Sequence, residues 1–270
     1  MTKLDLYQVD SFTNKLFKGN PAAIIFSELL PKSVMQKIAL ENNLSETAFI
    51  NAVGDNLFIK WFSPLMEIDL CGHATLAAAH IYFSEINKGS SSVTFNSTKN
   101  GSLTVTKKNN YLFLDFPVDY YEPIEIDKDL ISMLGSIPIE AFKGRDDIMC
   151  IFEDELSVHT IQPDMALLKL LPCRGLITTS KSSDYDFISR CFFPKTGVDE
   201  DPVTGSAHTT LTPYWSQKLA KETLLAKQVS ARGGELKCSL EGDRVIIGGE
   251  AITYMTVSYT HLTLPTTGSV

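Results

Sequence analysis

The sequence is poor in features that mark several whole classes of protein. No apolar run approaches the roughly 18 residues of a membrane-spanning helix, and the first residues lack the apolar segment of a signal peptide. Lys and Arg number 24 against 32 Asp and Glu, giving a net charge of −8, and the basic residues are scattered. A nucleic-acid binder would carry a concentrated basic face. We therefore expect a cytoplasmic protein that binds neither membranes nor nucleic acid.

The cysteines and histidines are also too few and too scattered for a metal framework. The cysteines are odd in number and form no C-x-x-C pair, which is typical of reduced thiols and not of disulfides or zinc sites. His73 and His80 lie on one expected helix, but no third metal ligand has suitable spacing, and H-E-x-x-H is absent. Neither G-x-G-x-x-G, G-x-x-x-x-G-K-[ST] nor G-x-S-x-G occurs. We expect no bound metal and no nucleotide cofactor. The five cysteines are Cys71, Cys150, Cys173, Cys191 and Cys238.

The 270 residues have the composition of a globular protein, with 44% hydrophobic and 21% charged residues. Short apolar runs bounded by Gly, Pro, Asn or Asp predict many strands. Helical periodicity is confined to a few stretches, and the middle one is apolar on all sides, which predicts a buried helix. The expected helices are Lys32–Asn42, His73–Ser84 and Ser206–Ala220, with weaker signals at Asp127–Leu134 and Pro163–Leu171.

The chain has the pattern of a degenerate internal duplication. An acidic, proline-containing stretch at 118–126 divides it near its middle, and each part has several strands and one long helix that starts after a glycine. Nearly the same spacing separates Gly72 from Gly205 and Asp69 from Asp201. The alternative is that two unrelated helices both start after a glycine. We expect lobes at 1–117 and 118–270, and the Thr-rich tail after about residue 252 has the composition of a non-native remnant.

Both of these helix starts are candidate anion-binding sites. The first N–H groups of a helix have no intrahelical partner, and the helix dipole favours negative charge beside them. Two facing helix starts would hold a small anionic substrate between the lobes. The residues that would offer these groups are Gly72, Ala74 and Thr75 in the first lobe and Gly205 and Ala207 in the second.

Acids and a histidine accompany the two helix starts. Glu46 opens an apolar strand and shares a face with Ala48, so burial of that face would place its carboxyl where it can exchange protons near neutral pH. The alternative is a solvated glutamate at a strand edge. His73 is a proton donor or a core histidine, Ser206 a donor or a helix cap, and Asp201 precedes a proline that holds its backbone extended.

Five motifs occur in order along the chain: F-K-G-N-P-A-A at 17–23, E-N-N-L-S-E-T-A at 41–48, D-L-C-G-H-A-T at 69–75, D-E-D-P-V-T-G-S-A-H at 199–208 and Q-V-S-A-R-G-G at 228–234. Together they resemble the phenazine-biosynthesis PhzF-like isomerase family over roughly residues 4–251. The resemblance implies an α+β, diaminopimelate-epimerase-like fold. In that fold two pseudo-symmetric strand-rich lobes each form a β-barrel-like sheet around a central helix.

The resemblance also implies a function. It makes Glu46 the catalytic acid/base, with His73, Asp201 and Ser206 around the substrate, in a homodimer that needs no metal or organic cofactor. The reaction would move a proton between carbons of a small carboxylated metabolite, unsaturated or amino-acid-like. Two alternatives stay open, a racemase or epimerase that uses Cys71 and a non-catalytic binding protein. Related racemases pair two cysteines, but Thr204 stands at the second position, which disfavours a two-thiol mechanism.

Overall fold

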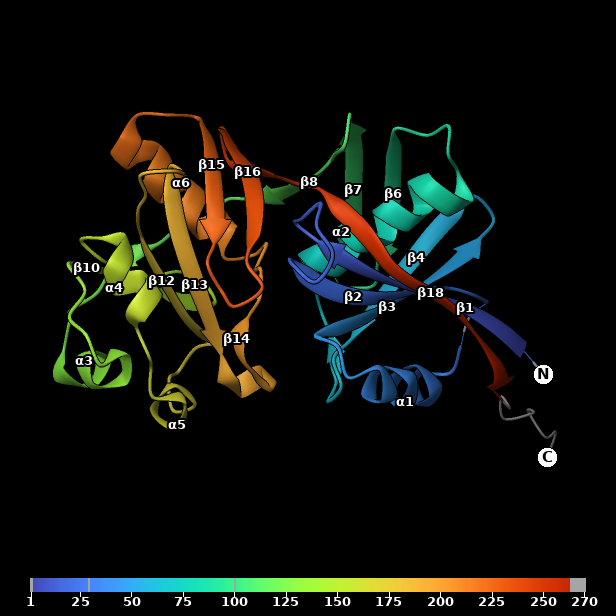
Figure 1. The fold of residues 1–270 in the computed structure, drawn as a ribbon, viewed down its shortest axis with the longest axis horizontal. Helices are drawn as coiled ribbons and strands as arrows, with labels where there is room; N and C mark the ends of the chain where they lie inside the picture. Colours follow the sequence, from blue (N-terminus) through green and yellow to red (C-terminus); the bar gives the residue numbers. More distant parts are fainter. Residues whose placement is uncertain (1, 29, 100, 263–270) are drawn as a thin grey trace.

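Two similar halves make up the protein, each a strongly curved sheet around one long helix (Figure 1). The computed structural model describes residues 2–28, 30–99 and 101–262. Strands dominate and helices are few, which confirms the predicted α+β class with two strand-rich lobes.

The first half contains the strands β1 to β8 and two helices. The helix α1 (Lys32–Asn42) connects two parallel strands, and α2 (Gly72–Ile81), which continues into a wider turn at Tyr82–Ile86, connects two others. The strands are β1 (Thr2–Ser11), β2 (Asn20–Phe26), β3 (Glu46–Val53), β4 (Asn56–Phe62), β5 (Glu67–Ile68), β6 (Ser92–Ser97), β7 (Gly101–Lys108) and β8 (Tyr111–Pro117).

The second half repeats this plan with three short helices and one long one. It contains α3 (Lys128–Leu134), α4 (Glu155–Thr160), α5 (Met165–Leu168) and the long helix α6 (His208–Leu219). Its strands are β9 (Glu122–Pro123), β10 (Glu140–Lys143), β11 (Asp147–Ile151), β12 (Gly175–Lys181), β13 (Phe187–Phe193), β14 (Val198–Asp201), β15 (Thr223–Gln228), β16 (Gly234–Glu241), β17 (Arg244–Gly249) and β18 (Ala251–Leu262).

The strand pairing follows one order in both halves. In the first half the order is β1-β2-β3-β4-β6-β7-β8, with parallel pairs at β2–β3 and β4–β6. In the second half it is β10-β11-β12-β13-β15-β16-β17, with parallel pairs at β11–β12 and β13–β15. The short strands β5 and β14 precede α2 and α6 at matching places. This correspondence supports the predicted duplication.

Strands β8 and β17 pair with each other and join the two halves. Within the second half β9 pairs with β10, whereas β18 crosses to the first half and pairs antiparallel with β1, from Ser11 opposite Ala251 to Thr2 opposite Leu262. The tail that the sequence left in doubt is therefore a strand of the first half as far as residue 262, and residues 263–270 lie outside the described residues. The predicted division into lobes at residues 117/118 stays a prediction. It assigns β18 to the second lobe, although this strand pairs with β1 of the first half.

The two long helices occupy the centres of the halves. All residues of α2 except Gly72 and His80 are buried, which confirms the prediction from its apolar sequence. The helix packs against β1, β2, β3, β8 and β18, whereas α6 packs against β15, β16 and β17. The helix α6 starts at His208, later than predicted, because tight turns precede it, with the His208 amide donating to the Gly205 carbonyl at 3.0 Å.

Candidate active site

The starts of α2 and α6 meet between the two halves. A Cβ atom added to Gly72 would lie 3.8 Å from the Cα of Gly205, and one added to Gly205 would lie 3.9 Å from the Cα of Gly72. A methyl group at either position would be in ordinary van der Waals contact with the opposite glycine. The two glycines of the duplicated motif therefore bring the first turns of both helices together.

Glu46 lies beside His73 at this junction. Its Oε2 is 3.2 Å from Nε2 of His73, and the exposed fractions of the two side chains are 17% and 7%. Glu46 begins β3, and Ala48, which shares its face, is fully buried. The alternative of a solvated strand-edge glutamate does not match this placement, since the carboxyl lies mostly out of water.

Asn20 connects this pair to the second half. It is fully buried, and its Nδ2 donates to Asp201 Oδ1 at 2.9 Å and to the Val203 carbonyl at 2.8 Å. The same nitrogen lies 3.2 Å from Nδ1 of His73. Both of its hydrogens are used by the two oxygens, and Nδ1 of His73 also lies 3.5 Å from Cys71 Sγ. Asn20 stands in the F-K-G-N-P-A-A motif, but its residue type alone gave no reason to assign it to the site.

Burial and neighbouring charges set the protonation of this group. Burial lowers the pKa of His73, but the Cys71 sulfur and the Glu46 carboxylate raise it by more, so that it stands well above its usual range. Burial raises the pKa of Asp201 to about 6, while His73 lowers it and the nearby Glu46 raises it. Burial, with Glu46 next, raises the pKa of the Cys71 thiol to about 11. Burial thus keeps the proton on the Cys71 thiol at neutral pH, and the neighbouring Glu46 favours the proton on His73.

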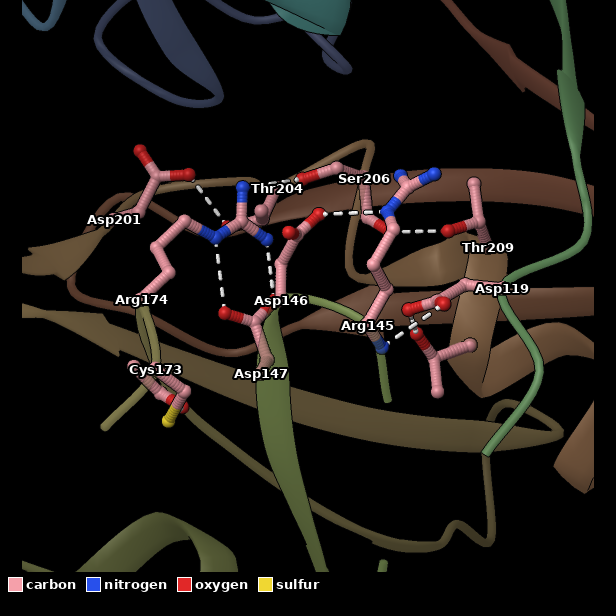
Figure 2. Close-up of polar contacts among 12 residues, drawn as sticks. Asp119, Arg145, Asp146, Asp147, Cys173, Arg174, Asp201, Thr204, Ser206 and Thr209 are labelled. Atoms are coloured by element: carbon pink, nitrogen blue, oxygen red, sulfur yellow. Dashed lines mark hydrogen bonds and ion pairs between the residues drawn. The ribbon is translucent and has the colours of Figure 1, made fainter. Parts of the chain in front are cut away.

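The second half surrounds Asp201 and Ser206 with further polar groups. Thr204 donates its hydroxyl to Asp201, and its amide donates to Gln228 Oε1 at 2.8 Å. Ser206 Oγ accepts a hydrogen bond of 3.0 Å from Nη1 of Arg174. Figure 2 shows Arg174 between Ser206 and Asp147, with Asp201 and Thr204 nearby. No sequence motif pointed to Arg174, which meets these residues only through the fold.

Among the predicted anion-binding residues, Thr75 uses both its amide and its hydroxyl on the Cys71 carbonyl, at 3.1 and 2.6 Å. These contacts favour a structural role for Thr75 over the predicted contact with substrate. The side chains of Ala74 and Ala207 are fully buried, so only their amides can contribute.

The duplication does not extend to Glu46. Gly175 begins β12 as Glu46 begins β3, and Ile177 and Ala48 follow at the same distance, both in the apolar cluster around the two long helices. A Cβ atom on Gly175 would lie 2.1 Å from the Phe192 carbonyl oxygen. The second half therefore has no room for a counterpart of Glu46.

One group of three potential metal ligands comes together in the described part of the chain. The ligand atoms of Glu46, Cys71 and His73 all lie within 4.8 Å of one another. Within this group Glu46 Oε2 lies 3.2 Å from Nε2 of His73, and Cys71 Sγ lies 3.5 Å from Nδ1 of the same ring.

A cavity of about 640 Å³ lies between the halves but away from this cluster. It is lined by the loop before β2, with Phe12 and Lys15, by the loop between β15 and β16, with Arg232, and by the connection between β12 and β13, with Tyr185. Neither Glu46, His73 nor Asp201 lines it.

Comparison with known proteins identifies the family. The profile of the family described as phenazine biosynthesis-like protein matches residues 9–257. The chain belongs to the phenazine biosynthesis-like family. An uncharacterized isomerase of Pseudomonas aeruginosa is 45% identical over 93% of this chain and 96% of its own length, and one of Halalkalibacterium halodurans is 46% identical over 94% and 98%.

The solved structures agree with this membership. The crystal structure of a PhzF-family protein from Enterococcus faecalis is 46% identical, with a TM-score of 0.92 over 96% of this chain and 100% of that one. The predicted diaminopimelate-epimerase-like fold is confirmed, and the protein is an enzyme of the isomerase class. None of its described helices has the length and apolar character needed to cross a membrane.

Proposed function

We propose that this member of the phenazine biosynthesis-like family moves a proton between carbons of a small carboxylated metabolite without a cofactor. The metabolite would be unsaturated or amino-acid-like, so that electrons of the broken C–H bond can enter a conjugated system. The shielded network Glu46–His73–Asn20–Asp201, which crosses between the two lobes, is the observation that carries the proposal.

Glu46 would act as the base and then as the acid. One of its oxygens accepts the Nε2 proton of His73, and the other is available to take a proton from the substrate carbon. The negative charge that develops on the substrate would be stabilised by donation from His73 and Ser206. Glu46 would then return the proton to another carbon, which completes the shift of the double bond and leaves the enzyme unchanged.

The substrate would enter when the two lobes separate. Gly72 and Gly205 lie close together, since a Cβ atom added to either would lie within 4 Å of the Cα of the other, and we expect the halves to move apart to admit a ligand between the helix starts and then to close again. General acid–base catalysis supplies roughly 10² to 10⁴ in rate, and exclusion of water by closure would add to it. Asp201, close to Glu46 in the closed form, would favour a proton on one of the two carboxyl groups by repulsion.

Cys71 gives little support to the racemase alternative. Its buried thiol is protonated at neutral pH because its pKa is raised to about 11, and Thr204 stands at the matching place in the second lobe.

We also propose, from the family resemblance, a cytoplasmic homodimer. Its mass in solution would be twice that of the 29.9 kDa chain, which sedimentation equilibrium can measure.

The variant Glu46→Gln tests the proposed role of the base. The wild-type enzyme is incubated for a prolonged time in ²H₂O with a panel of unsaturated acids and amino acids. We expect deuterium to appear on a carbon atom of at least one compound. Glu46→Gln should lower that rate by about 10³-fold or more, since a neutral amide cannot accept the proton. Glu41→Gln, at an exposed position of α1, is the matched control and should retain the full rate. A Glu46→Gln enzyme with near-native exchange would exclude Glu46 as the base.

A further inference from the structure

Two contacts hold Arg174 in the second lobe, one with the buried carboxylate of Asp147 and one with the aromatic ring of Phe193. Its Nε donates to Asp147 Oδ1 at 2.9 Å and its Nη2 donates to the other oxygen of the same carboxylate. The exposed fraction is 31% for the Arg174 side chain and 5% for that of Asp147. The guanidinium carbon lies 4.6 Å from the centre of the Phe193 ring. The position of the guanidinium group is therefore fixed before any ligand arrives.

The donors of Arg174 are not all used by the protein. A guanidinium group has five N–H donors, and Asp147 takes one from Nε and one from Nη2. Ser206 Oγ takes one from Nη1. Among the described residues, one N–H on each Nη is left for a further acceptor. Ser206, because it accepts from Arg174, keeps its own hydroxyl proton as a donor beside those N–H groups (Figure 2).

Arg190 of the same lobe shows how a purely structural arginine differs. It also lies over a phenylalanine, 4.9 Å from the ring centre of Phe192, and it also bonds a carboxylate through Nε and Nη2, that of Glu200. Its Nη1, however, faces the carbonyls of Val158, His159 and Ile161 at 3.2, 3.3 and 2.8 Å. Backbone carbonyls thus surround Nη1 of Arg190. On Arg174 the corresponding nitrogen donates only to Ser206 among the described residues, which leaves N–H groups for a further acceptor.

The surrounding charges limit what Arg174 can bind. Asp147 balances its charge, Asp146 pairs with Arg145, and the Asp119 carboxylate bonds the Arg145 amide and the Thr210 hydroxyl. Three acids thus stand against two guanidinium groups near Ser206. A planar carboxylate with one charge matches two parallel N–H donors, whereas a phosphate dianion would be repelled by these acids.

We propose that Arg174 binds the substrate carboxylate, and that the substrate is a singly charged acid whose carboxylate lies against the second lobe while its reacting carbon faces Glu46. This inference rests on the proposed function for the direction of the reacting carbon. The first lobe then carries out proton transfer, and the second lobe selects for the ionised acid.

Binding of matched probe pairs tests the proposal without turnover. The probes are benzoate with benzamide, sorbate with sorbamide, and inorganic phosphate, titrated at pH 7.5 by ligand-observed NMR. The wild-type protein should bind each acid at least tenfold more tightly than its amide. Charge-assisted hydrogen bonds of this kind change affinity by about 10- to 100-fold, so Arg174→Met/Asp147→Asn should lose that preference while amide binding stays within about twofold. The double change removes both charges and leaves no unpaired buried acid.

Two further variants separate binding from folding. Arg174→Lys keeps the charge beside Asp147 but lacks the parallel donors, and it should retain only part of the preference for acids. Arg190→Met/Glu200→Gln is the matched control, which should lower the stability of the fold and leave the preference unchanged.

Three results would overturn the proposal: equal binding of acids and amides by the wild type, a preference that survives in Arg174→Met/Asp147→Asn, or tighter binding of phosphate than of benzoate. Failure of the proposed function is a separate outcome. It would appear as exchange activity in Glu46→Gln, a variant that should still prefer acids over amides.

Discussion

The strands β3 and β12 occupy matching places in the two lobes, yet they begin with opposite chemistry. β3 begins with the carboxylate of Glu46, whereas β12 begins with Gly175, preceded by the guanidinium group of Arg174. The residues paired with these strand starts differ as well, since Ala22 lies beside Glu46 and Asp147 beside Gly175. A duplicated scaffold therefore supplies two similar helix starts, and in our proposals acid–base chemistry belongs to the first lobe and charge recognition to the second.

The starts of α2 and α6 show the same division. Cys71 and His73 stand at the first, where the imidazole reaches Glu46, and Thr204 and Ser206 stand at the second, where the serine reaches Arg174. Asn20 connects the two sides through Asp201. In our proposals the residues of the first lobe move the proton and those of the second lobe bind the acid. The proposed isomerisation needs both groups of residues at the junction between the lobes.

The largest expected effect comes from adding a side chain where the second lobe excludes one. Gly175→Ala places a Cβ about 2.1 Å from the Phe192 carbonyl oxygen, a backbone atom that cannot move away alone. We expect a loss of about 3 kcal/mol in the free energy of unfolding. Glu46→Ala, at the matching place in β3, should cost about 1 kcal/mol. Urea denaturation measures both, and equal costs would contradict the proposed asymmetry.

A second effect, which reaches a similar size only at the upper end of its pH range, is expected when the buried charge of Asp201 is removed. Its pKa is raised from 3.8 to about 6, so the folded protein binds the proton more tightly than the unfolded chain. This contribution to stability is complete below about pH 4 and is lost as the pH rises to about 6. The charged form then costs roughly 3 kcal/mol.

Asp201→Asn does not titrate and should gain stability over the wild type between pH 4 and pH 7, by up to roughly 3 kcal/mol. Urea midpoints at four pH values in this range measure the difference. A difference that does not change with pH would show that Asp201 has an ordinary pKa. Asp199→Asn, at an exposed position of the same strand, is the control.

The smallest effect is expected at Cys71. The raised pKa of its thiol, about 11, leaves little thiolate at neutral pH. Cys71→Ala should keep deuterium exchange within about twofold of the wild type, and iodoacetamide should label the native protein slowly at pH 7.5. Loss of exchange in Cys71→Ala would favour the racemase alternative.

The sequence predicted the parts of the site that lie close to its motifs. The resemblance carried by the five motifs predicted that Glu46, His73, Asp201 and Ser206 gather between two lobes. The structure links Glu46, His73 and Asp201 through Asn20, and it places Ser206 on Arg174. Their catalytic roles stay proposals. The short helices were less accurately placed, since the expected helix Pro163–Leu171 is confined to Met165–Leu168.

Other features depend on contacts between distant parts of the chain, which no local pattern records. Arg174 meets Asp147 and Ser206 only because β11, β12 and the turn before α6 converge. The strand β18 pairs with β1 from the opposite end of the chain, and its Thr-rich sequence gave no apolar signal for that pairing. Asn20 was within a quoted motif, but its importance follows from the three partners that surround it.

The central claim is that a single shielded carboxylate both removes and returns the proton. A single-turnover reaction in ²H₂O, with enzyme in excess over a substrate from the exchange panel, tests it most directly by mass spectrometry of the product. If Glu46 alone carries the proton, part of the first-formed product retains its original hydrogen and contains no deuterium. One full deuterium in every product molecule, at all times sampled, would contradict the claim and indicate two separate bases.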